Sequence, residues 1–166
     1  MALEMFLKMD GVTGGSNNFS HKGWSDVHSW GWAMISNRGS AHVTDKDKTS
    51  FREISIVKKI GMDSTAIMLL YAQGKVIPTA ELDIIPVVAK RETRRKYMSI
   101  RMEDVLVKSI ITGGNSSDDN FNENIILLFD KIHFEYNVNA IPGMDSPGKD
   151  AANYNFDWDI TQNRIL

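Results

Sequence analysis

Hydrophobic and polar residues alternate along most of the chain with the period of two that is typical of β-strands. In residues 3–9, for example, four apolar side chains alternate with Glu4 and Lys8. Strands are expected over residues 3–9, 24–35, 49–60, 79–88, 96–111, 122–138 and 153–160. The segments 96–111 and 122–138 are apolar on both faces at their centres, which indicates strands that are covered on two sides.

One segment, residues 63–75, follows the helical period instead. Asp63 or Ser64 is expected to be the N-cap, and Gly74 is expected to end the helix at its C′ position. Its apolar face is expected to consist of Ile67, Leu70 and Tyr71. A chain of many strands and one short helix favours a small β-barrel or a β-sandwich.

The stretch "HKGWSDVHSWGWAMIS" (21–36) places Trp24, Trp30 and Trp32 within nine residues. In a regular strand these three rings share one face with Asp26 and His28. An exposed aromatic face would suit a carbohydrate-binding module. We favour the interpretation that the rings belong to the core or to a subunit interface, because aromatic residues form strands and fill barrel interiors.

Composition limits the functional classes. The 166 residues are expected to form one domain, 1–166, and the net charge of −2 suggests no nucleic-acid partner. The chain has no Cys, no apolar stretch long enough to insert into a membrane, and no secretory signal in "MALEMFLKMDGVTGG". We therefore expect synthesis in the cytoplasm and any export by a machine that needs no cleaved signal.

No catalytic motif stands out, so we expect neither an enzyme nor a cofactor. The four histidines, His21, His28, His42 and His133, lack the spacing of metal ligands. A hydrolase that uses paired carboxylates stays open, because such residues can be distant in the chain.

Several segments, in order, resemble the Hcp family, which forms the tube of bacterial type VI secretion systems. They are "MFLKMDGVTGGS", "HKGWSDVHSWGW", "ISIVKKI" followed by a helix ending in "GK", "YMSIRMEDVLVKSI", "NENIILLFDKIHFEY" and "YNFDWDITQN". Each piece alone is weak, but the series covers nearly the whole chain.

The resemblance implies a mainly β fold, a small barrel of two sheets with one short helix, similar to phage tail tubes. It also implies homohexameric rings that stack into a hollow tube. In the family the tube lies in a contractile sheath, carries a spike protein at its tip, is expelled into target cells, and holds effectors in its lumen. Because the chain ends near its last strand, we expect bound rather than fused cargo.

The polar segment 37–50 corresponds to the family's extended loop, which reaches from one ring to the next. Its mixed charges suit a contact with a complementary face. The expected stacking residues are Arg38, His42, Asp45, Lys46, Asp47 and Lys48.

Overall fold

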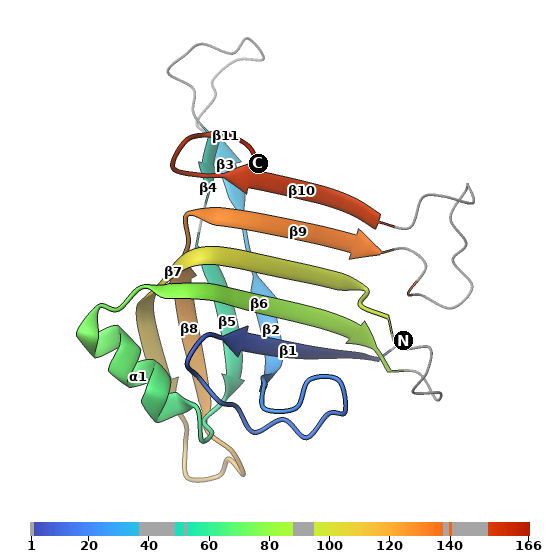
Figure 1. The fold of residues 1–166 in the computed structure, drawn as a ribbon. Coiled ribbons are helices and arrows are strands. Elements are labelled where there is room, and N and C mark those ends of the chain that lie inside the picture. Colours follow the sequence, from blue (N-terminus) through green and yellow to red (C-terminus); the bar gives the residue numbers. More distant parts are fainter. Residues whose placement is uncertain (1, 37–48, 52, 88–94, 138–139, 141–152) are drawn as a thin grey trace.

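The computed structural model describes residues 2–36, 49–51, 53–87, 95–137, 140 and 153–166 (Figure 1). The strands and the helix of these residues are β1 (Leu3–Met9), β2 (Ser25–Gly31), β3 (Met34–Ser36), β4 (Thr49–Phe51), β5 (Ile54–Lys59), α1 (Ser64–Gln73), β6 (Ile77–Pro86), β7 (Met98–Gly113), β8 (Asn122–Leu128), β9 (Lys131–Asn137), β10 (Asn153–Asp159) and β11 (Arg164–Ile165). The expectation of a mainly β barrel with one short helix is confirmed.

Six strands close into a barrel, and all of their pairings are antiparallel. The order of the nine-stranded sheet is β11-β10-β9-β7-β6-β1-β2-β5-β8, and a further pairing of β7 with β8 completes the circle. Strands β9, β10 and β11 extend the sheet beyond the barrel, whereas β3 and β4 form a separate two-stranded sheet (Figure 1).

The long strand β7 joins the two sides of the barrel. Its first part, Met98–Glu103, pairs with β6 and β9, and its second part, Leu106–Gly113, pairs with β8. Between them Asp104 has a positive φ of 54°, and the register with β8 shifts between Val107 and Ser109. These irregularities bend the strand from one sheet into the other.

The core lies inside the barrel and is built from the inward-facing positions of every barrel strand. These positions include Leu7, Ile56, Leu82, Ile100 and Ile125, all of which are fully buried. An aromatic group made of Trp32, Phe51, Phe129, Phe134, Phe156 and Trp158 packs together near β3, β9 and β10. Apolar and polar residues alternate along the barrel strands because each strand directs one of its faces into this shared interior.

Helix α1 ends as expected, because Gly74 adopts a left-handed conformation with φ 60° and its N–H donates to the Tyr71 carbonyl. Ile67 is buried and Leu70 packs against the core. Tyr71, which was expected on the same helical face, is 49% exposed.

Three expected strands are each divided in the structure. Residues 24–35 form β2 and β3, residues 49–60 form β4 and β5, and residues 122–138 form β8 and β9. The last division occurs at Asp130, whose N–H donates to the Glu103 carbonyl. Periodicity alone does not reveal these breaks, because the apolar residues continue through them.

The expected common face of the three tryptophans is also wrong. The register of β2 with β5 shifts between Val27 and Ser29, so His28 is an extra residue in the ladder. Beyond this bulge Trp30 stands opposite the buried Ile56 and packs against the core, whereas Trp24 lies before the bulge. One inserted residue exchanges the faces of a strand.

Candidate functional site

The outer face of β1, β6, β7, β9 and β10 carries many charged side chains. The strand register places one row of them directly side by side, namely Lys8, Glu81, Arg101, His133 and Asp157. Most of these charges have partners within the chain; for example, Arg101 lies 3.6 Å from Glu103 and Lys131 3.7 Å from the same carboxylate. Most of the charge on this face is therefore already neutralised by ion pairs within the chain.

His133 connects β7 with β10 across β9. Its Nε2 lies 3.2 Å from Glu103 Oε1 and its Nδ1 lies 2.9 Å from Asp157 Oδ1. Both ring nitrogens can donate to these carboxylates only when the imidazole is protonated. The contact is partly exposed and fixes the outer strands to the barrel.

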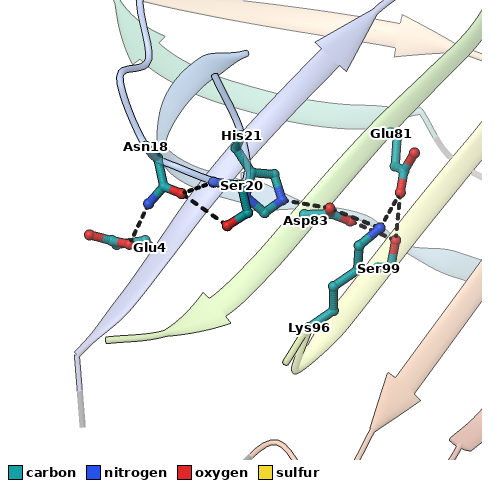
Figure 2. A network of polar contacts seen from close by, with 8 residues as sticks. All are labelled: Glu4, Asn18, Ser20, His21, Glu81, Asp83, Lys96 and Ser99. Atoms are coloured by element: carbon teal, nitrogen blue, oxygen red, sulfur yellow. Dashed lines mark hydrogen bonds and ion pairs between the residues drawn. The ribbon is translucent and has the colours of Figure 1, made fainter. Parts of the chain in front are cut away.

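A buried polar network lies farther along the same face (Figure 2). Asp83 is fully buried and accepts hydrogen bonds from His21 Nε2 at 2.8 Å and Ser99 Oγ at 2.7 Å. Lys96 Nζ lies 3.0 Å from Asp83 and 2.6 Å from Glu81. Ser99 donates to the carboxylates and not to His21, so the group lacks the nucleophile–base contact of a catalytic triad. It fixes the connection between β1 and β2 to the barrel.

We expect the Asp83 network to make the fold sensitive to acid. Burial would raise the pKa of Asp83, but hydrogen bonds from His21, Ser99 and Lys96 outweigh burial and hold that pKa below its ordinary value of 3.8. The ionised carboxylate therefore stabilises the native state above about pH 4, and this contribution declines as the pH falls toward the native pKa. Urea unfolding at several pH values should show a smaller acid-dependent loss in Asp83→Asn than in the parent. Equal losses would contradict the assignment.

A second buried cluster lies beneath the N-terminus of α1. Lys58 is 1% exposed, and its Nζ lies 2.9 Å from Asp63 Oδ1 and 2.6 Å from Glu123 Oε1. Ser25 donates to Asp63, and Ser64 donates to Glu123. Asp63 thus occupies the N-cap position without a side-chain capping bond, because its carboxylate faces Lys58. The cluster fastens the helix to β2, β5 and β8.

The outer face of the four strands β2, β5, β8 and the second half of β7 differs in character from the charged face. Its central positions are small, polar or aliphatic, and they carry no charge. They are Ser29, Gly31, Ser55, Val57, Ser109, Ile111, Asn124 and Ile126. The two sides of the barrel therefore present chemically different surfaces.

In the described part of the chain, the sheet formed by these four strands also has two lateral edges that are not paired with another strand. Strand β2 pairs with β1 only at Ser25 and Asp26, and from Val27 to Gly31 it pairs with β5 alone. On the opposite flank Leu106–Gly113 of β7 pairs with β8 alone. Among the described residues, the outer backbone groups of both edges have no strand partner. Such edges invite pairing with another chain.

Comparison with known proteins identifies this architecture. A family model described as "Type VI secretion system effector, Hcp" matches residues 6–136, which is most of the chain. The chain belongs to the Hcp family. Protein hcp1 of Pseudomonas aeruginosa is 32% identical over 165 residues, covering 98% of each chain.

Solved structures of Hcp proteins share the fold. Hcp1 from Salmonella typhimurium superposes with a TM-score of 0.79 at 23% identity and covers 100% of both chains. A structure described as a type six secretion system protein gives 0.81 at 21% identity, with 98% and 99% coverage. As an Hcp protein, the chain is a structural, non-enzymatic tube component of a type VI secretion system, and the family is secreted.

The sequence-predicted site residues of this Hcp chain are partly described. Trp30 and Trp32 are half-buried and pack against the core. Trp24 contacts His21 edge-on at 4.7 Å, and Lys8 lies over its ring. The expected stacking residues lie outside the described part: Arg38, His42, Asp45, Lys46, Asp47 and Lys48. Their role in stacking, and that of the tryptophans in subunit contact, stay predictions.

The sugar-binding alternative lacks the surface that it needs. A sugar-binding surface of stacked indole rings requires the three tryptophans to lie exposed on one face. The bulge in β2 separates Trp24 from the other two. Within the described ranges, no cluster of His, Asp and Glu is placed to hold a metal ion. No helix in those ranges has the length and apolar character of a membrane span.

Sequence reasoning missed the two free edges and the buried Lys58 cluster. Free edges depend on which strands pair, and that information is absent from a one-dimensional pattern. A usable signal existed for Lys58, which shares the inward-facing positions of its strand with Ile54 and Ile56.

Proposed function

We propose that six copies of this chain close head to tail into a ring, and that the rings stack into a hollow tube. The tube lies within a contractile sheath, carries a spike at its tip, and is expelled into target cells with effectors in its lumen. Family membership supports this proposal and supplies the number six.

The observation that carries the proposal is the pair of free strand edges on opposite flanks of one sheet. Three successive antiparallel pairings connect β2 to β5, β5 to β8 and β8 to β7, so β2 and the second half of β7 run in opposite directions. The β7 edge of one copy can therefore extend the sheet of the next copy by antiparallel pairing with its β2. Repetition of this heterologous contact produces a closed ring when the rotation fits.

The contrast between the two outer faces supports an orientation in that ring. Pairing through β2 and β7 would join the uncharged faces of the four-stranded sheets into one continuous inner wall. A wall of small polar and aliphatic residues suits varied cargo, because it offers few charges that would repel or hold a particular protein. The charged face of β1, β6, β7, β9 and β10 then lies away from the lumen.

Light scattering coupled to size exclusion tests the ring. We expect about six times the monomer mass, as a closed cyclic assembly requires. A monomer at micromolar concentration would contradict the proposal.

The segment 37–50 is proposed to connect successive rings. Strand β3 ends directly before this segment, and β4 begins at Thr49 within it. The two strands pair through Met34 and Phe51, Ile35 and Ser50, and Ser36 and Thr49. Replacing residues 39–48 by a short Gly/Asn turn should spare the barrel, because the entropy of loop closure varies slowly with loop length. Electron microscopy should then show rings without tubes. Tubes of normal length from the shortened protein would place stacking elsewhere.

A further inference from the structure

Helix α1 presents an apolar surface to solvent. None of its ten residues is charged, and Met68, Leu69 and Tyr71 are exposed, with Leu69 at 57%. Met62 before the helix and Val76 after it are exposed as well. A helix whose outer face stays in water normally carries charged residues there, whereas a helix that is apolar all round is buried. The composition of α1 therefore indicates that another surface covers it.

The position of α1 identifies where that surface must come from. The helix packs against β7, the strand that has the free edge on this flank. Figure 1 places α1 and the connection between β1 and β2 at the same end of the barrel. A subunit that paired with the β7 edge would present its own β2, and with it this connection, next to the helix.

The connection carries one strongly exposed aromatic side chain, Phe19, at 83%. The turn around it is held by hydrogen bonds: Asn18 Oδ1 accepts from the Ser20 N–H, and Asn18 Nδ2 donates to Glu4 at 3.1 Å. The Asn18 carbonyl accepts from the N–H of His21, which is itself fixed by Asp83. Phe19 is thus an apolar side chain on a preorganised turn, the kind of residue that anchors protein interfaces.

We propose that Phe19 of one subunit docks on the apolar surface of α1 in the adjacent subunit, formed by Met62, Met68 and Leu69. This contact rests on the proposed ring. It deepens that proposal by naming a lateral contact made by side chains, in addition to backbone pairing between β2 and β7. The occupant is a second copy because both halves of the contact are present in each chain, on opposite flanks. Both halves are uncharged and apolar, so burial of each by the other is favourable.

Disulfide trapping tests this contact, because the chain contains no native Cys. The double variant Phe19→Cys/Leu69→Cys, oxidised at assembly concentration, should give a ladder of covalent oligomers up to the hexamer on a non-reducing gel. Each single variant should stay uncrosslinked, since identical positions do not meet in a head-to-tail contact. Mixed and reassembled single variants should give covalent dimers, which excludes a bond within one chain.

A matched control uses Tyr154, which is 52% exposed at the beginning of β10. Tyr154→Cys/Leu69→Cys should give no ladder. Light scattering on the parent and on every variant separates the two proposals. Rings without the Phe19–Leu69 crosslink would overturn the docking contact and leave the ring proposal intact, whereas a parent that forms no ring would overturn both.

A substitution experiment provides a second readout. Phe19→Asp should raise the protein concentration required for half-assembly by about tenfold or more, as the loss of an interface anchor does. Tyr154→Asp should leave that concentration unchanged. Both residues are exposed in the monomer, so both variants should keep the parent circular dichroism spectrum. Assembly of Phe19→Asp at the parent concentration would overturn the contact.

Discussion

Replacing Lys58 by Met should lower the free energy of unfolding by about 3–5 kcal/mol, because it leaves two buried carboxylates without a cation. Lys58 Nζ lies within 2.9 Å of Asp63 and 2.6 Å of Glu123, and all three side chains are almost completely buried. The loss should be visible as a lower midpoint in urea with an unchanged slope, which indicates a change in stability and not in the extent of unfolding.

The neighbouring lysine is the matched control. Lys59 is exposed, so Lys59→Met should change the stability by no more than about 0.5 kcal/mol. Adding Glu123→Gln to Lys58→Met should restore part of the loss, because one of the two unpaired charges is then removed. Parent-like stability of Lys58→Met would show that the cluster does not contribute as its geometry indicates.

This cluster also illustrates what the sequence could and could not predict. The period of two in "ISIVKKI" places Lys58 on the inward side together with Ile54 and Ile56. A buried lysine requires a partner, but the partner Glu123 lies far away in the chain, next to an unrelated turn. Only the pairing of β5 with β8, which sets Lys58 opposite Glu123, brings the two together.

The fold itself was largely predictable, because the hydrophobic period is a local property. The boundaries of β1, α1 and β10 follow from alternation, from the caps and from Gly74. The breaks that divide longer segments were not predictable, since they occur where a strand must leave one sheet for another. Residues 122–138 are an example: β8 pairs with β5 and β7, but β9 pairs with β7 and β10.

The proposed assembly surfaces were predictable only in part. Segment 63–75 has an uncharged helical centre, which a reading of charge along the chain would have found. The exposure of Phe19 could not be inferred, because an apolar residue in a polar turn is as compatible with burial under the turn as with exposure. The resemblance to the Hcp family implied a ring, and the sequence suggested Trp24, Trp30 and Trp32 as core or interface residues, but neither pointed to Phe19 or to the helix.

The bulge in β2 leads to the second large prediction, a difference between Trp30 and Trp24. Trp30 lies opposite Ile56 and packs against the core, so Trp30→Ala removes a large inward-facing side chain. The variant should lose about 3–5 kcal/mol of unfolding free energy, as is usual when a core aromatic is truncated to Ala. Partial exposure of the indole places the expected value toward the lower end of this range.

Trp24 precedes the bulge, and its ring contacts Lys8 and His21 on the outer face. Trp24→Ala should therefore cost clearly less than Trp30→Ala in the same urea titration, although both remove the same atoms. If the two variants lost equal stability, the alternation of β2 would continue unbroken through His28, and the assignment of the bulge would be wrong. If neither lost stability, both rings would be exposed and available to a ligand.

The mass of Trp30→Ala provides a separate readout. A parent-like melting temperature combined with a monomeric mass would place Trp30 at a subunit interface, because removal of the indole would then weaken association and not folding.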